Sequence, residues 1–188
     1  MNRNTTNEEV IAATRQWLEK AVIGLNLCPF AKSVHVKKLI RYVVSTALTP
    51  DDLRRDLLKE LELLAKTPRD KIDTILLIHP QVLTDFLDYN DFLAVVNITL
   101  EEADLVGILQ VASMHPNYQF AGTKTDEITN FTNRSPYPTL HLIREDSIDE
   151  AVAVFPEAEM IFEKNMETMR KLGHEGWNAL GLADVQKH

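Results

Sequence analysis

The segment Ile72–Ile78 (IDTILLI) is a nearly continuous apolar run between polar residues, and it narrows the folds open to this chain. A strand of this composition is typical of a sheet with helices on both faces, where neither side of the strand meets water. No apolar run in the chain reaches the roughly 18 residues that a membrane-spanning helix requires. The segment therefore predicts a central strand in an α/β fold.

Helical and strand patterns alternate on both sides of this run. Thr6 and Glu9 form a capping-box signature, and Thr49 with Pro50 marks a second helix start, followed by a buried face of leucines at 53, 57, 61 and 64. The expected elements are a helix over 7–24, a strand over 39–45, a helix from 50, a strand over 72–78, a two-part helical region over 82–87 and 92–100, a strand over 108–113, a strand over 139–144, a helix opened by a capping box of Ser147 and Glu150 and ending at Val154, and a last helix from Pro156 to Gly173.

These elements predict one α/β domain, or an α+β domain, over residues 1–173. The order is helix, strand, helix, strand, helix, strand, long loop, strand, helix, helix, with the helices packed on a small mixed sheet of about four strands. A chain of 188 residues can bury a real core as one domain. Residues 174–188 are expected to form a loosely ordered tail, in which Trp177 and Leu180 could dock.

The helical crossovers between the first three strands favour parallel, neighbouring strands. His79 and His115 each follow one of these strands, directly before a proline, so both are expected at the carboxyl edge of the sheet. If the fourth strand runs antiparallel to the third, its start near Tyr137 returns to the same edge. Ligands of open α/β sheets favour the crevice outside the carboxyl ends of the strands. The sequence therefore predicts a site at this edge.

The long segment between the third and fourth strands, residues 114–138, is expected to be an ordered loop that covers this site. Structureless connections of this length are uncommon in compact domains, and its aromatic residues and prolines argue against disorder. We expect His79, His115, Tyr118 and Arg134 to be catalytic. The expected substrate-binding residues are Gln119, Asn133, Ser135 and Tyr137.

Several chemical roles remain open for these groups. The two imidazoles could act as general acid and base, could bind a divalent metal with Asp126 or Cys28 as a third ligand, or could only cap their strands. Arg134 could grip an anionic metabolite in bidentate fashion, or fasten the loop through an ion pair with Asp126 or Glu127. The resident cofactor, if there is one, is unknown.

Two further residues carry a functional and a structural interpretation each. Cys28 precedes a Pro-Phe-Ala-Lys turn, and a helix starting there would lower the thiol pKa and make a nucleophile. A lone cysteine is otherwise a small buried hydrophobic residue. His141 lies within the fourth strand, either as a hydrogen-bonded sheet histidine or as a support for the rim.

The composition limits the partners and the compartment. A formal net charge of −8 argues against nucleic-acid binding, which needs a positive footprint. The first residues lack the apolar core of a signal peptide, and a single cysteine fits a reducing compartment. We therefore expect a soluble cytoplasmic protein with no membrane partner. The oligomeric state is not predicted.

Four strings carry a family resemblance: Gly24–Ala31 (GLNLCPFA), Phe86–Phe92 (FLDYNDF), His115–Phe120 (HPNYQF) and Asn133–His141 (NRSPYPTLH). With them, roughly residues 8–173 resemble a bacterial and plastid family catalogued as domain of unknown function 1415. The resemblance implies membership of an uncharacterised group, and it assigns no activity, cofactor or catalytic residue.

Two functions from different classes follow from the residues. The first is a small-molecule enzyme with its His/Arg/Tyr site at the carboxyl edge under the loop. The second is a non-catalytic module that binds a metabolite or a protein there. A purely structural protein, with the histidines and Arg134 buried for stability, is the third alternative.

Overall fold

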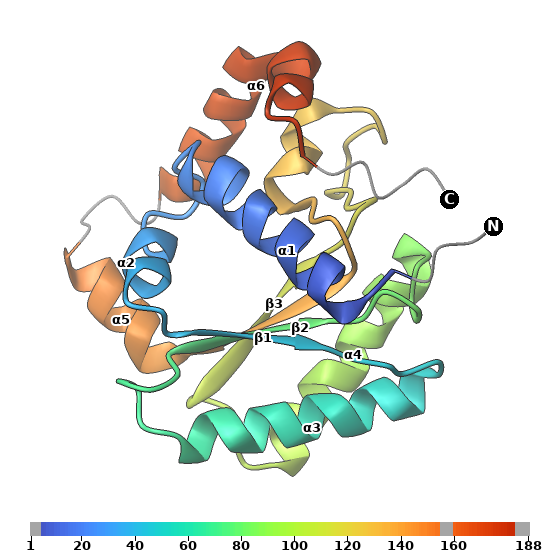
Figure 1. Ribbon diagram of the computed structural model, residues 1–188, viewed down its shortest axis with the longest axis vertical. Coiled ribbons are helices and arrows are strands. Elements are labelled where there is room, and N and C mark those ends of the chain that lie inside the picture. The colour runs from blue at the N-terminus through green and yellow to red at the C-terminus, as the bar shows by residue number, and fades with distance from the viewer. Residues whose placement is uncertain (1–4, 155–159, 183–188) are drawn as a thin grey trace.

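The computed structural model describes residues 5–154 and 160–182, and it places a four-stranded sheet between two layers of helices (Figure 1). The strands are β1 (Ile40–Val44), β2 (Thr74–Ile78), β3 (Leu109–Met114) and β4 (Thr139–Arg144), in the spatial order β1-β2-β4-β3. β1 and β2 are parallel, and β4 is antiparallel to both of its neighbours. The first three strands therefore point the same way, as predicted. They are not three adjacent strands, however, because β4 lies between β2 and β3.

The helices cover both faces of this sheet (Figure 1). Their bounds are α1 Asn7–Trp17, which continues as a π-helix over Leu18–Ile23, then α2 Ala31–Val36, α3 Pro50–Lys66, α4 Phe86–Glu102, a 3-10 helix Ile128–Asn133, α5 Glu145–Val154 and α6 Ile161–Ala179. Helices α3 and α4 cover one face, while α1 and α6 lie over the other. The mixed sheet with helices packed on it confirms the predicted fold class.

Strand β2 is buried along its whole length, which confirms that it is covered on both faces. Ile75 and Leu77 belong to the core formed with α3 and α4. Leu76 and Ile78 point the other way and pack with Val10 of α1. The predicted buried face of α3 is also confirmed. The four leucines of that face, at 53, 57, 61 and 64, are fully buried in the α3–α4 core.

Two predicted helix starts are wrong. The predicted helical segment over 82–87 is mostly turn, and α4 begins at Phe86, where the Asp85 carboxylate accepts hydrogen bonds from the first-turn amides. Helix α5 begins at Glu145, so Ser147 lies inside it rather than at its cap. The Ser147 hydroxyl instead donates to Asp73, and Glu150 pairs with Arg69. At α5 these tertiary contacts outweighed the local capping signature, whereas at α4 the local Asp85 cap determines the start.

Only residues 174–182 of the predicted tail are among the described residues, and most of these are helical. Helix α6 continues across a kink at Gly173 (φ 63°) to Ala179. Trp177, Leu180 and Leu182 pack against the cluster formed by Trp17 and its neighbours. The predicted start of the last helix at Pro156 lies outside the described residues.

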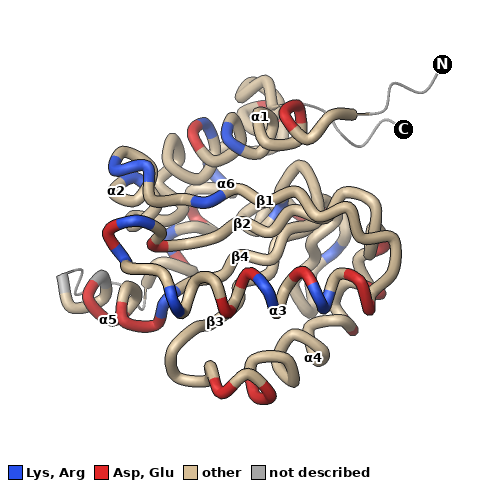
Figure 2. Tube along the Cα trace, turned by 60° about the horizontal axis from the view of Figure 1, so that its bottom comes forward, with Lys and Arg blue, Asp and Glu red and all other residues tan. Residues whose placement is uncertain are grey.

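Charged residues lie mostly on the helices and their connections, with basic residues on α2 and both signs alternating along α3 (Figure 2). The strands carry few of them, consistent with their burial between two helical layers. In the described ranges, 5–154 and 160–182, we find no helix with the length and apolar character needed to span a bilayer.

Candidate functional site

His79 and His115 meet at the carboxyl edge of the sheet, as the strand directions predicted. The two residues directly follow β2 and β3, and their rings flank the ring of Tyr89 from α4, with centroid distances of 5.7 Å and 5.0 Å. All three side chains are fully buried. The backbone N–H of His79 donates to Pro138 O, and that of His115 to Asn133 O, so the end of the long loop is fixed to the same edge.

Tyr89 is the residue that sequence reasoning missed. Its hydroxyl donates to the Thr139 carbonyl at 2.8 Å and accepts from the Met114 N–H at 2.9 Å. It thus joins the end of β3 to the start of β4. Its spacing from Phe92 and Val96 along α4 places it on the buried face of that helix. This helical spacing was the feature of the sequence from which its burial could have been predicted.

The hydrogen bonds of the two imidazoles fix opposite tautomers. Nδ1 of His79 lies 2.9 Å from the Val82 carbonyl, which can only accept, so Nδ1 carries the proton. Nδ1 of His115 accepts from the Asn117 N–H at 3.0 Å, so its Nε2 carries the proton and donates to the Leu83 carbonyl. The two rings therefore hold consecutive carbonyls of one turn.

That turn is strained. Leu83 has φ 55°, a conformation that costs a bulky residue about 1–3 kcal/mol. Strained backbone of this kind persists only where the surrounding contacts over-determine it. The two imidazole–carbonyl hydrogen bonds are contacts of that sort.

Both imidazoles are held neutral by their surroundings. Burial lowers the pKa of His79 to about 4, and burial likewise lowers the pKa of His115. The Nε2 atom of His79 is buried and has no hydrogen-bond partner among the described residues. The site therefore contains a neutral imidazole with an unpaired, proton-accepting nitrogen.

Arg134 fastens the loop through main-chain carbonyls. Its Nε donates to Tyr118 O at 3.2 Å and one terminal nitrogen donates to Thr125 O at 2.6 Å, while the guanidinium lies 4.2 Å from the centroid of the Phe131 ring. No ion pair joins it to Asp126 or Glu127 within the described ranges. Two of its three nitrogens are thus already engaged by the loop.

Three of the four expected substrate-binding side chains also form hydrogen bonds within the protein, and the fourth is buried. Gln119 donates to Thr123 O, Asn133 donates to Ser113 O, and the Ser135 hydroxyl donates to Tyr137 O. The Tyr137 ring is buried against α1 and β2. These contacts give the loop its shape, and they direct the polar atoms of Gln119, Asn133 and Ser135 to the protein rather than to an open cleft.

The aromatic contacts of the buried histidines continue through Phe86 and Tyr118 toward the protein surface. Phe86 contacts both His115 and Tyr118, with centroid distances of 5.5 Å and 5.2 Å. Tyr118 in turn contacts Phe120, which lies 5.7 Å from Phe162 on α6, a half-exposed ring. A continuous series of aromatic contacts therefore links the histidines to the outside of the molecule.

Cys28 lies away from this edge, and burial raises its thiol pKa. Backbone N–H groups of Phe30 and Ala31 at the start of α2 do favour the thiolate, but burial against the cluster that contains Trp17 outweighs them. This raised pKa favours the interpretation of Cys28 as a packed structural residue over that of a nucleophile. Asp126 is exposed, and no group of three His, Cys, Asp or Glu side chains in the described part of the chain could hold a metal ion.

His141 is a hydrogen-bonded sheet histidine. Its Nε2 lies 2.7 Å from the Thr74 hydroxyl on the neighbouring strand, and burial lowers its pKa to about 4. Its register partner on β2 is Leu76, which points away from the α3–α4 core. The structural interpretation accounts for its contacts.

A family model described as "Protein of unknown function (DUF1415)" matches residues 9–179. The chain belongs to this family. The matched range includes the strings that carried the resemblance, with both rim histidines, Tyr89 and Arg134. Neither a curated protein nor a solved structure matches this chain.

The first prediction concerns the acid stability of this DUF1415 protein. Between pH 6.5 and 4 the unfolded state protonates its histidines, whereas folded His79 stays neutral, so stability is lost as the pH falls through this range. Asn at position 79 can retain the donor to Val82 O without an ionisable ring. Urea unfolding at pH 7 and pH 4.5 should show that His79→Asn loses less stability than the wild type, by on the order of 2 kcal/mol. Equal losses in the two proteins would contradict a buried neutral His79.

The second prediction concerns the single thiol. Because burial raises the pKa of Cys28, we expect slow reaction of the native protein with a disulfide reagent at pH 7.5 and fast reaction in denaturing urea. Labelling followed spectrophotometrically measures both rates. Fast labelling of the native protein would mean that Cys28 is an exposed thiolate.

Proposed function

We propose that the chain is a small-molecule enzyme in which the neutral imidazole of His79 accepts a proton from the substrate. The observation that carries this proposal is the buried, unpaired Nε2 of that ring. A buried polar atom without a partner costs about 1–3 kcal/mol. A catalytic role is one of the recognised reasons for a native protein to keep such a group.

The electrostatics favour an anionic substrate. A general base works best when its pKa lies near the working pH, and the His79 pKa of about 4 is below that. A carboxylate or phosphate placed beside the ring would stabilise the imidazolium and raise this pKa. Arg134 would give up its hydrogen bond to one of the two loop carbonyls and donate to the same anionic group instead. Tyr118 would line the path by which the substrate enters.

The substrate must enter through a conformational opening, because His79 is fully buried. The turn over residues 80–85 would have to move, because the carbonyls of Val82 and Leu83 are the hydrogen-bond partners of the two rings. Opening would release the Nε2–H of His115, which could then donate a hydrogen bond to the substrate, and the imidazolium formed at His79 would return the proton from its Nε2. Gln119, Asn133, Ser135 and Tyr137 would shape the loop around the bound molecule. We place this enzyme in the cytoplasm, in line with its single cysteine.

A non-catalytic metabolite- or protein-binding module is the second candidate. The satisfied hydrogen bonds of Gln119, Asn133 and Ser135 favour it, because they leave the loop as a formed surface rather than as a set of reactive groups. In this case a ligand would bind at the rim and leave unchanged.

The third prediction separates the two candidates. After a metabolite screen identifies a molecule that is converted, His79→Asn should lower kcat by about 10²–10⁴-fold, because the variant lacks the accepting nitrogen. Wild-type activity should be lost as the pH falls through the apparent pKa of His79. The matched control is His141→Asn, which removes another buried histidine of equally low pKa outside the rim.

Full turnover by His79→Asn would overturn the assignment of the base. Binding of a metabolite at the rim without any conversion by the wild type would favour the binding module. Circular dichroism and urea unfolding at pH 7 establish that each variant is folded before its rate is interpreted.

A further inference from the structure

The edge of the sheet opposite the histidines carries a basic helix and an acidic helix. Strand β1 begins where β4 ends, because Ile40 is in register with Thr74 of β2, and Thr74 with Ile143. Helix α2 lies just before β1 in the chain, and α5 follows β4 directly. Figures 1 and 2 both place the two helices on the same side of the molecule. The strand ends from which they extend are two strands apart, roughly 10 Å.

Helix α2 presents lysines that have no partner. Lys32, Lys37 and Lys38 are exposed, and no ion pair or hydrogen bond joins their ammonium groups to another described residue. Val36 lies among them and is 70% exposed. Lys32 and Val36 are four residues apart and therefore share the outer face of the helix. This face combines unpaired positive charge with an apolar side chain.

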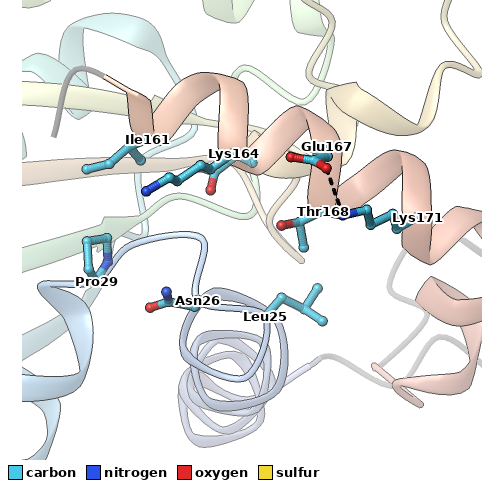
Figure 3. A pocket seen from close by; sticks show the side chains of 9 residues that line it. Leu25, Asn26, Pro29, Ile161, Lys164, Glu167, Thr168 and Lys171 are labelled. Carbon is cyan, nitrogen blue, oxygen red and sulfur yellow. Dashed lines mark ion pairs between the residues drawn. The ribbon is translucent and has the colours of Figure 1, made fainter. Parts of the chain in front are cut away.

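The lysines of α6 differ from those of α2. Lys164 and Lys171 line a pocket against the turn at 25–29 (Figure 3), and both already interact within the chain. Lys171 pairs with Glu167 at 2.7 Å, and Lys164 is likewise engaged. In a chain of net charge −8, the unpaired lysines on α2 and the turn that follows it therefore form a local reversal of charge.

Helix α5 carries the opposite charge on its outer face. Asp146 and Asp149 are exposed and three residues apart, so they lie on one side of the helix. Arg144 attracts Asp146 electrostatically, but no ion pair joins either aspartate to a described residue. Val152, three residues after Asp149, is 42% exposed. This face has the same make-up as that of α2, with the sign of the charge reversed.

The turn that leads into β2 lies between the two helices, because β2 lies between β1 and β4. Arg69 of this turn pairs with Glu150 of α5 at 2.7 Å, which fixes the turn to that helix. Asp70 and Lys71 are neighbours of opposite charge, and their side chains are 75% and 73% exposed. The charge along this face therefore changes from positive on α2, through a balanced turn, to negative on α5.

We propose that this face, which consists of α2, the turn over residues 67–73 and α5, binds a second copy of the chain. A two-fold axis through the turn places α2 of each protomer opposite α5 of the other, and a two-fold interface requires such self-complementarity. Lys32 and Lys37 then face the aspartates of the partner's α5, and Val36 contacts the partner's Val152. The charges select a second copy because one face supplies both halves of each contact.

The dimer is expected to be weak and sensitive to salt, since exposed charge pairs contribute little to affinity and are screened by ions. The face lies at the edge opposite His79, so the proposal stands whether or not the histidine rim is catalytic.

The fourth prediction is a measurement of this dimer by sedimentation velocity on the full chain. At about 25 mM salt we expect a monomer–dimer equilibrium that shifts to monomer at about 500 mM, because the Debye length falls. Lys32→Glu with Lys37→Glu, and separately Asp146→Lys with Asp149→Lys, should each raise the dissociation constant of the dimer by at least about tenfold. An equimolar mixture of the two variants should dimerise like the wild type, because both contacts again join opposite charges.

Lys59→Glu with Lys124→Glu is the matched control. Both lysines are exposed, one on α3 and one in the long loop at the histidine edge, and the change in net charge equals that of the basic-helix variant. This control should dimerise like the wild type, and circular dichroism establishes that every variant is folded.

A wild type that stays monomeric at low salt up to about 0.5 mM protein would overturn the proposal. Equal weakening by the control, or a mixture no tighter than the separate variants, would do the same. Weakening by the α2 variant alone would mean that α2 meets some other acidic surface, and it would overturn the pairing with α5.

Discussion

The Tyr89 hydroxyl joins β3 to β4 at the edge where β2 also ends, and the arrangement of the rim depends on this link. Strand β4 is antiparallel to both neighbours, so its first residue meets the last residues of β2 and β3. The hydroxyl satisfies one N–H and one carbonyl there without water. The Tyr89 ring then separates the two histidine rings, and this determines how close they can come.

The two buried histidines beside Tyr89 also hold the two segments that cover this edge, the turn around Leu83 and the end of the long loop. Each imidazole is neutral and uses one nitrogen to hold a carbonyl of the turn around Leu83. Each histidine backbone holds the returning end of the long loop. The rim is therefore closed from two sides by segments that meet at the histidines. A ligand that competed for these hydrogen bonds would act on both segments at once.

The sequence predicted the direction of the strands and the meeting of His79 with His115 because both follow from short-range features. Apolar runs gave the strands, the crossover lengths gave their direction, and each His-Pro pair marked a strand end. The place of β4 between β2 and β3 could not be predicted in this way. It is a pairing between segments that are distant in the chain, and either edge of β3 would have satisfied the same local pattern.

The partners of individual side chains were the least predictable part of the site. Arg134 was expected to bind an anion or an acidic residue, but any nearby carbonyl can accept from a guanidinium, and two in the loop do so. For Cys28, the helix-start effect that the sequence indicated is present. It is outweighed by burial against a cluster in which segments from both ends of the chain meet. Such outcomes depend on the complete packing, which no local pattern contains.

The most direct test of this account is the protonation state of the two rim imidazoles, which ¹⁵N NMR of the histidine side chains at pH 7 can measure. We expect two neutral rings of opposite tautomer, with the proton on Nδ1 of His79 and on Nε2 of His115. A charged ring, or the same tautomer in both, would contradict the hydrogen bonds to Val82 and Leu83. The closed rim would then have no physical basis.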